Sequence, residues 1–243
     1  MERIVYYLTY IPLKLYGQKA EPKAALKFLF NIHKRVLTLI SERASDYDGG
    51  VHPKHRLMRY HDFFTERLHK GEKVLDVGSG IGFLAYDMAS TGAEVVGIEL
   101  SKKNIDKANS LYKLPNLKFI LGDAWEVCQL ADTEEKFDTV VMSNVLEHID
   151  DRVGFIKKVQ SSVHASRWLI RVPCFDRDWT VALAQELGLD SRLDETHFTE
   201  FTRESFEKEM TAASLKIVYL EVRWGEIWAE LKPHRHPVSV TKK

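Results

Sequence analysis

Val74-Leu75-Asp76-Val77-Gly78-Ser79-Gly80-Ile81-Gly82-Phe83-Leu84-Ala85 is a short apolar run that leads through three glycines into a helical pattern. Glycines permit a tight turn and let a ligand approach the N-terminus of the next helix without obstruction by Cβ atoms. The spacing is D-x-G-x-G-x-G, with Asp76 at the strand tip. A dinucleotide loop would need glycine where Phe83 stands, and a phosphate-binding loop would need a Gly-Lys-Ser/Thr sequence. The stretch therefore predicts a strand, a ligand-binding turn and a helix. The turn is neither a dinucleotide-binding loop nor a phosphate-binding loop.

Short β-rich runs alternate with helical stretches from Lys73 onward. Strand, helix and strand repeated with short loops predict parallel strands joined by crossover helices. The last two runs leave no room for a helix between them and should form an antiparallel hairpin. We therefore predict an α/β fold with a seven-stranded, mostly parallel sheet, helices on both faces and an antiparallel last strand. The predicted strands are Lys73–Asp76, Glu94–Glu99, Leu117–Leu121, Thr139–Ser143, Trp168–Val172, Lys216–Val222 and Ile227–Leu231.

Polar side chains follow the next three predicted strands. Glu99 ends the second strand, where a carboxylate can accept hydrogen bonds from both hydroxyls of a ribose. Asp123 follows the third strand, where a carboxylate can bind an adenine amino group. The fourth strand ends at Ser143-Asn144, beside the switch point where such sheets bind ligands. Together with the glycine turn, these positions predict a site for an adenosine-containing ligand.

With these features the chain resembles the class I S-adenosylmethionine-dependent methyltransferases, closely over about residues 70–175 and in outline elsewhere. The resemblance implies a Rossmann-like sheet, S-adenosylmethionine as cofactor and S-adenosylhomocysteine as product. It places the methionine part of the cofactor on the glycine turn, the ribose on Glu99 and the adenine near Leu100 and Asp123. The implied cofactor-binding residues are Asp76, Gly78, Ser79, Gly80, Gly82, Glu99, Leu100, Asp123, Ala124 and Asn144.

The chemistry of a sulfonium cofactor fits the same stretch. The cofactor carries no pyrophosphate, so the turn needs an anion near a cationic ligand, and Asp76 supplies one. Methyl transfer is an in-line displacement, so the enzyme must align donor and nucleophile and, where needed, accept a proton.

Two histidines are the candidates for that proton transfer. Glu147-His148 resembles the Leu-Glu-His signature of a small-molecule methyltransferase subgroup that includes the ubiquinone-pathway O-methyltransferases. His148 can act as a general base near neutral pH, or it can be a helix-start residue that shapes the pocket. A second histidine, His197, lies in the variable region after the fifth strand. We predict His148, His197 and Glu147 as the catalytic residues.

A metal site is the alternative use of these side chains. Thr196-His197-Phe198-Thr199-Glu200-Phe201-Thr202-Arg203 resembles a segment of the metal-dependent small-RNA 2′-O-methyltransferases, in which such a histidine joins a Glu-x-x-Glu-His set. Here Asn144 replaces the first carboxylate, which weakens the site for a hard cation. A divalent metal is therefore possible but not favoured, and we assign no metal ligands.

The N-terminal region differs in composition from the rest. Residues 1–45 carry eight basic and three acidic side chains, a surplus of five positive charges, and apolar residues recur there at helical spacing. A helix that covers the core is the first interpretation, and a basic amphipathic helix on an anionic membrane is the second. Glycines after Asp48 break the chain. We predict a helical extension or lid over 1–50, a methyltransferase domain over 51–233 with an acceptor-side insert at 175–209, and a flexible tail at 234–243.

The net charge and the residues of the insert indicate which class of molecule could accept the methyl group. The chain has 35 basic and 35 acidic residues, whereas polyanion-binding domains usually have a basic surplus, so nucleic acid is not expected as a partner. Aromatic and charged residues of the insert suit a polar organic molecule; the aromatic ones are Phe175, Trp179, Phe198 and Phe201. We predict O-methylation of a small molecule or of a glycan or lipid intermediate.

Other functions and locations stay open at this stage. The chain could be a non-catalytic, adenosyl-cofactor-binding regulatory or scaffold subunit, or its acceptor could be an RNA 2′-hydroxyl or a protein. No apolar run is long enough to span a membrane, and Met1–Tyr16 is a poor signal peptide because it contains Pro12 and Lys14. We predict a cytoplasmic protein with peripheral membrane contact through the N-terminus as an option. The sequence leaves the oligomeric state open.

Overall fold

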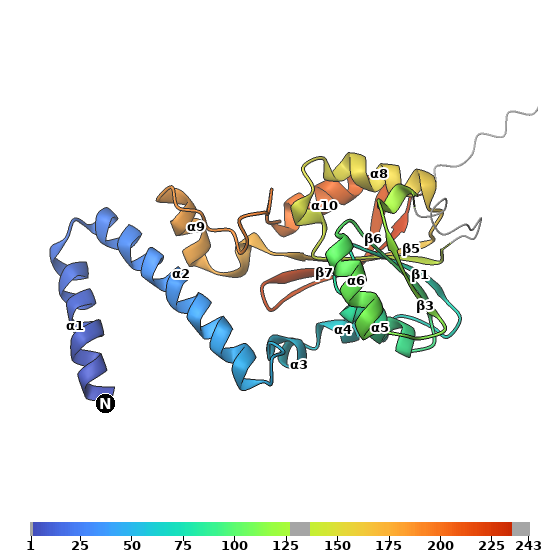
Figure 1. The fold of residues 1–243 in the computed structure, drawn as a ribbon. Helices are drawn as coiled ribbons and strands as arrows, with labels where there is room; N and C mark the ends of the chain where they lie inside the picture. Colours follow the sequence, from blue (N-terminus) through green and yellow to red (C-terminus); the bar gives the residue numbers. More distant parts are fainter. Residues whose placement is uncertain (1, 127–136, 235–243) are drawn as a thin grey trace, which may run out of the picture. The chain divides into compact units, whose positions relative to one another are not determined.

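The structure, a computed structural model, describes residues 2–126 and 137–234 (Figure 1). These residues form two compact units. The first contains the residues up to Met58 together with Asp178–Ser191, and the second contains Arg59–Arg177 and the residues from Arg192 onward.

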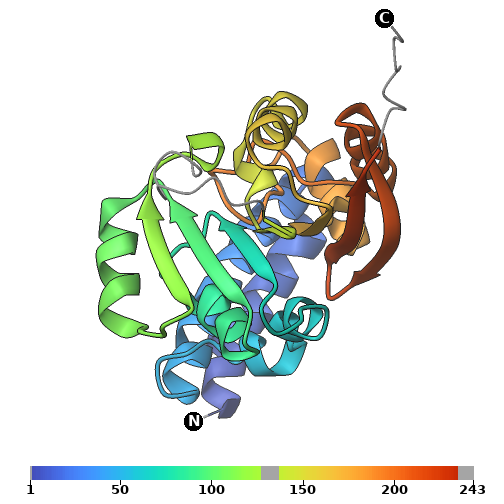
Figure 2. The same ribbon diagram turned by 90° about the vertical axis from the view of Figure 1, so that its right-hand side faces the viewer.

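The second unit is built on a seven-stranded sheet of order β3-β2-β1-β4-β5-β7-β6. Strands β1 to β5 pair in parallel, and β7 is antiparallel to both of its neighbours, which confirms the predicted sheet. The β6–β7 hairpin forms the edge opposite β3 (Figure 2). The strands are β1 (Lys73–Val77), β2 (Glu94–Glu99), β3 (Leu117–Leu121), β4 (Thr139–Ser143), β5 (Arg167–Pro173), β6 (Leu215–Arg223) and β7 (Glu226–Pro233).

Helices cover both faces of this sheet, as predicted (Figure 1). On one face lie α4 (Tyr60–Thr65), α5 (Phe83–Ser90) and α6 (Lys102–Leu111), and on the other lie α8 (Arg152–Ser162) and α10 (Arg203–Ala212). Side-chain caps fix where several of them begin. Ser101 and Asp151 cap α6 and α8, and Thr202 forms a reciprocal capping box with Ser205 at the start of α10.

Burial on both faces explains the apolar character of the central strands. All residues of β4 except Ser143 are buried, and β5 is buried from its second residue onward. Parallel strands covered on both sides have near-continuous apolar runs of this kind. The largest fully buried side chains include Trp168 of β5 and Trp228 of β7, and Phe63 of α4 lies edge-on to Trp228 with ring centroids 5.4 Å apart.

The first unit is helical. It contains α1 (Glu2–Lys19), α2 (Pro22–Tyr47), α3 (Lys54–Met58) and α9 (Trp179–Glu186). Glu21 joins α1 to α2 and caps α2, because its carboxylate accepts hydrogen bonds from the backbone N–H groups of Lys23 and Ala24 at 2.9 and 2.8 Å. The rings of Tyr16 and Phe28 pack with their centroids 4.7 Å apart.

The boundaries drawn from the sequence stay predictions. The first unit runs to Met58 rather than to residue 50, and the predicted insert at 175–209 is divided between the two units. Of the predicted tail, His234 donates its backbone N–H to Ser214 at 2.7 Å, and 235–243 lie outside the described residues. Among the helices that the structure describes, none combines the length and the apolar character needed to cross a bilayer.

Candidate active site

The three glycines after β1 serve different purposes. All have positive φ: +67° at Gly78, +55° at Gly80 and +87° at Gly82. A Cβ atom on Gly78 would lie 2.8 Å from a methyl group of Val145, and one on Gly82 would lie 2.4 Å from the Phe119 ring. A Cβ atom on Gly80 would meet no atom within 4 Å. Gly78 and Gly82 are therefore required for packing, whereas Gly80 leaves open backbone that a ligand can approach.

Glu99, at the end of β2, holds this glycine turn. Its Oε2 atom accepts a hydrogen bond from Gly80 N at 3.0 Å, and its Oε1 atom accepts one from Ser101 N at 2.9 Å. Each carboxylate oxygen has two lone pairs, so each can accept one more hydrogen bond from a ligand hydroxyl. The predicted ribose carboxylate is thus also the anchor of the turn, a role that the sequence analysis missed.

A cavity of about 550 Å³ opens beside the turn. Its lining comes from the carboxyl-end segments of β1 to β4 and from α8. Ligands bind at this end of the strands in open α/β sheets. The lining includes five of the predicted cofactor-binding residues, which are Gly78, Glu99, Leu100, Asp123 and Ala124.

Asp76 and Ser79 lie buried next to this cavity, with polar atoms that lack partners. Within the described part of the chain, Asp76 Oδ2 and Ser79 Oγ make no hydrogen bond. Burial, with the charge of Glu99 as the second cause, raises the pKa of Asp76 to about 8. A cationic ligand would favour the ionised carboxylate and lower this pKa. Unpartnered polar atoms next to the open backbone of Gly80 therefore fit a positively charged cofactor.

Three further residues line the cavity that the sequence analysis did not select. Trp125 follows Ala124 in a short 3₁₀ helix, η1 (Ala124–Glu126), and contacts two residues of α8. Lys158 Nζ lies 3.5 Å from the Trp125 ring centroid, and Phe155 lies edge-on to the same ring. Burial raises the pKa of Asp123, and the Lys158 charge opposes this shift. No local signal marks these residues, because only the packing of α8 brings them to the site.

Asn144 is held by an arginine of the neighbouring strand. It has φ of +56°, its Oδ1 accepts a hydrogen bond from Arg171 Nε at 2.7 Å, and its N–H donates to Arg171 O at 2.9 Å. Arg171 is buried, lies 4.0 Å from the Tyr60 ring centroid and is 3.3 Å from a carboxylate oxygen of Glu226. Asn144 therefore connects the end of β4 to β5, and its predicted contact with a cofactor stays a prediction.

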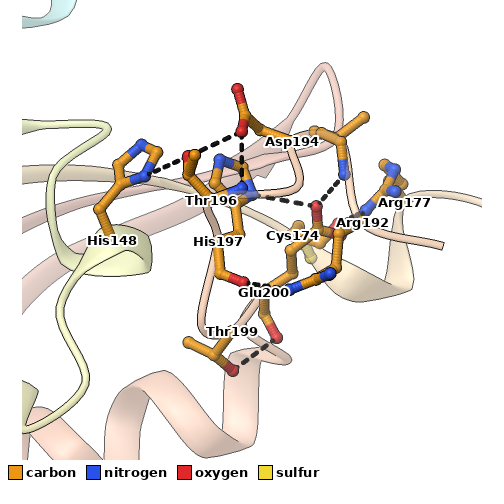
Figure 3. Close-up of polar contacts among 10 residues, drawn as sticks. His148, Cys174, Arg177, Arg192, Asp194, Thr196, His197, Thr199 and Glu200 are labelled. Carbon is orange, nitrogen blue, oxygen red and sulfur yellow. Dashed lines mark hydrogen bonds and ion pairs between the residues drawn. The ribbon is translucent and has the colours of Figure 1, made fainter. Parts of the chain in front are cut away.

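The predicted catalytic residues come together at the end of β4. The short helix η2 (Leu146–His148) carries Glu147 and His148, and its flanking residues Val145 and Ile149 line the cavity. The rings of His148 and His197 lie 4.8 Å apart between centroids (Figure 3). One ligand atom from each of Glu147, His148 and His197 lies within 4.8 Å of the other two. The fold thus brings together residues from the segment that follows β4 and from the segment before α10.

A hydrogen-bond relay fixes His148 (Figure 3). The hydroxyl of Thr196 donates to Asp194 Oδ1 at 2.7 Å and lies 3.0 Å from His148 Nδ1. Because the hydroxyl has a single proton, which it gives to Asp194, its oxygen accepts from Nδ1–H of His148. This assigned tautomer leaves Nε2 of His148 free to accept a proton. Burial, with His197 as the second cause, lowers the pKa of His148.

Glu200 holds the second histidine. Its Oε1 atom lies 3.3 Å from His197 Nδ1, and its other oxygen forms an ion pair with Arg177. Arg192 donates a hydrogen bond to the backbone carbonyl of His197 at 2.7 Å. His197 is 6% exposed and the Glu200 side chain is 2% exposed, so both are fixed by packing.

Glu147 is the buried carboxyl group of this cluster. It is 0% exposed, and neither carboxylate oxygen has a hydrogen-bond partner among the described residues. Burial raises its pKa to about 8, with Glu226 and Glu200 adding to the shift and Arg171 opposing it. The group is therefore a neutral acid near neutral pH unless a cation binds beside it.

The donor set of the cluster also fits a metal ion. Two imidazoles and one carboxylate are typical of Zn²⁺ and Fe²⁺ sites rather than of Mg²⁺ sites. Glu200 would orient His197 as outer-shell carboxylates orient histidine ligands. Asn144, which replaces the carboxylate of the metal-dependent enzymes, is instead bound by Arg171. A metal here stays a prediction that the sequence analysis did not favour.

The aromatic residues of the predicted insert differ in their exposure to solvent. Phe201 is fully buried and lies edge-on to Phe206, with centroids 5.7 Å apart, so it is a core residue. Phe198 and Trp179 are 62% and 73% exposed. The exposed Phe198, next to His197, is thus available to contact an acceptor.

Comparisons with known proteins agree with this architecture. Residues 68–228 match a family model described as a methyltransferase domain. The chain is 33% identical over 148 residues to the ubiquinone biosynthesis O-methyltransferase of Alkalilimnicola ehrlichii, covering 58% of this chain and 57% of that protein. It is 38% identical over 89 residues to the Pelagibacter ubique protein of the same name, covering 37% and 36%. The chain thus spans less than two thirds of the length of these relatives.

Two solved structures show the same fold. Magnesium protoporphyrin IX methyltransferase from Synechocystis, with S-adenosylhomocysteine bound, aligns with a TM-score of 0.52 and 17% identity over 96% of this chain and 98% of that chain. The small RNA methyltransferase HEN1 aligns with a TM-score of 0.58 and 17% identity over 75% of this chain and 25% of that chain.

Proposed function

The chain belongs to the family of class I, S-adenosylmethionine-dependent methyltransferases, and from that membership we propose that it methylates an oxygen atom of a small molecule or of a glycan or lipid intermediate. The observation that carries the proposal is the placement of His148. It ends the short helix η2, whose flanking residues Val145 and Ile149 line the cavity, and its tautomer leaves Nε2 free to accept a proton.

The residues around the cavity are assigned to the cofactor as follows. S-adenosylmethionine supplies an electrophilic methyl group on a positively charged sulfur. Glu99 would bind the ribose hydroxyls, Asp123 and Ala124 the edge of the adenine, and Leu100 its face. The glycine turn would hold the methionine part, with the unpartnered carboxylate oxygen of Asp76 near the positive charge.

His148 is proposed as the general base. The pKa of a hydroxyl acceptor lies far above neutrality, so transfer gains from a base placed on its proton, typically by ~10²–10⁴-fold. The lowered pKa of His148 keeps its ring unprotonated near neutral pH. Thr196 and Asp194 hold the ring in the tautomer that accepts a proton at Nε2. Glu200 and Arg177 fix His197 beside it.

The nature of the acceptor rests on charge and on the named relatives. The formal net charge of zero disfavours long nucleic acids. The two relatives named above are ubiquinone biosynthesis O-methyltransferases, which supports a small organic acceptor with a hydroxyl group. We propose that the reaction takes place in the cytoplasm, and an RNA 2′-hydroxyl or a protein remains the alternative acceptor.

A metal-assisted version of the reaction is the second candidate. It rests on the three ligand atoms of Glu147, His148 and His197 that lie within 4.8 Å of one another. In that version an ion would polarise the acceptor oxygen, and Glu147 would lose its proton when the ion binds. Full activity in the presence of a strong chelator would contradict it.

The test is methyl transfer by the purified protein. Labelled S-adenosylmethionine and a cell extract should yield a labelled small molecule with the natural chain, and His148→Ala should lower the rate by about 10²–10⁴-fold. His164→Ala, at an exposed histidine remote from the cavity lining, is the matched control. Cofactor binding without any transfer would instead favour a non-catalytic regulatory or scaffold subunit.

A further inference from the structure

Helices α1 and α2 expose an unusual amount of apolar surface. More than half of the exposed large apolar side chains in the described part of the chain lie on these two helices. Ala25 is the buried residue of α2, and α1 has none among the residues described. The exposed apolar residues are Ile4, Val5, Tyr6, Tyr7, Leu8, Tyr10, Leu15, Tyr16, Phe28, Leu29, Val36, Leu37, Leu39, Ile40 and Tyr47.

Three lysines of α2 lie opposite its apolar side. With 100° per residue, Leu29, Val36 and Ile40 fall on one side, together with Leu39, whereas Lys23, Lys27 and Lys34 fall on the other. Arg35 lies at the border beside Leu39, and Arg43, which pairs with Asp46 at 2.8 Å, lies on the apolar side. Leu39 and Ile40 are 60% and 56% exposed, so the apolar side is open to solvent in the second half of the helix.

The chemistry of these helices matches the surface of an anionic bilayer. Residues 1–45 carry eight basic and three acidic side chains. Four tyrosines of α1, Tyr6, Tyr7, Tyr10 and Tyr16, are 42% to 65% exposed. Tyrosine is enriched at the interface between lipid and water, because its ring is apolar and its hydroxyl is polar. An amphipathic helix with a basic polar side lies in that interface plane.

We propose that the α1–α2 surface, defined as the exposed apolar residues of α1 and α2 with their basic side chains, binds the surface of an anionic lipid bilayer. A second copy of the chain is a poorer occupant, because it would place two surfaces with a charge surplus of the same sign together. A nucleic acid would match the basic residues but leave the apolar side exposed. This inference goes beyond methyl transfer and does not depend on it.

The test is binding of the 243-residue chain to vesicles, without cofactor. Vesicles of phosphatidylcholine mixed with phosphatidylglycerol should bind the protein, and vesicles of phosphatidylcholine alone should bind it much more weakly. The binding should weaken as salt rises, because the Debye length falls from about 10 Å at 0.1 M to about 3 Å at 1 M. Cosedimentation measures both effects.

Charge and apolar variants separate the two contributions. Lys27→Gln with Arg35→Gln should weaken binding by about 30-fold, since each basic residue near such a surface contributes about 1 kcal/mol. Lys103→Gln with Lys107→Gln, which removes the same charge from the exposed side of α6, should change it by less than about twofold. Ile40→Ser, on the apolar side of α2, should weaken it by about tenfold, whereas Leu111→Ser, at a residue of similar exposure on α6, should not.

Several results would overturn the proposal. These are equal binding to the two kinds of vesicle, equal losses in the α2 and α6 variants, or no binding at low salt by a protein whose circular dichroism is that of a folded chain. A dimer in sedimentation that Ile40→Ser dissociates, with no vesicle binding, would assign the surface to a second copy instead.

Discussion

Replacing Glu147 by glutamine is expected to change how the stability of the protein depends on pH. The Glu147 carboxyl group is fully buried without a hydrogen-bond partner among the described residues, and its pKa is raised from 4.5 to about 8. Between these two pH values the folded chain keeps a proton that the unfolded chain has lost. Stability therefore falls as pH rises through this window. Glutamine has no such proton, so the variant lacks this contribution.

The size of the effect follows from the shift in pKa. Each pKa unit corresponds to about 1.4 kcal/mol, so the free energy of unfolding of Glu147→Gln should exceed that of the natural chain by about 4 kcal/mol at pH 8. At pH 4.5 the two should differ little, because the Glu147 carboxyl is then neutral in the folded protein. The buried Asp76, with its pKa also raised to about 8, affects both chains alike and cancels in the difference.

Guanidinium unfolding followed by circular dichroism, at several values of pH and with a chelator present, measures this difference. Glu94→Gln, at an exposed glutamate of β2, is the control and should keep the pH dependence of the natural chain. A stability difference between Glu147→Gln and the natural chain that is the same at pH 5 and pH 8 would refute the burial of an ionisable Glu147.

Four predictions concern the cofactor and the chemistry. Gly80→Val should abolish binding of S-adenosylhomocysteine in calorimetry. Gly71→Val, at another open glycine with positive φ, should keep this binding, although both substitutions introduce a similar backbone strain. Glu99→Ala should weaken the same binding by about 1.5–3 kcal/mol or more, since the variant also loses the anchor of the glycine turn; unchanged affinity would remove Glu99 from the site. The acidic limb of the pH–rate profile should have its midpoint below pH 6.5, because burial lowers the pKa of His148. Thr196→Val, which removes the hydroxyl beside His148 Nδ1, should lower turnover without changing cofactor affinity.

Local patterns in the sequence were sufficient to predict the elements of the catalytic unit. Alternating β-rich and helical stretches located all seven strands to within about two residues at each end, because apolar runs and helix caps are properties of neighbouring residues. The glycine turn and Glu99 could be predicted for the same reason. A turn that follows a strand, and the residue that ends the next strand, can each be recognised from a short stretch of sequence.

The contacts that make the candidate site depend instead on the order of the strands and on the packing of distant segments. His148 meets His197, 49 residues later in the chain, only when the segment after β4 and the segment before α10 are both in place. Asn144 meets Arg171 only when β4 and β5 are paired. The pairing of β7 between β5 and β6, the relay from Asp194 through Thr196, and the burial of Glu147 arise in the same way. These features depend on side chains that are far apart in sequence, so no periodicity or spacing along the chain records them.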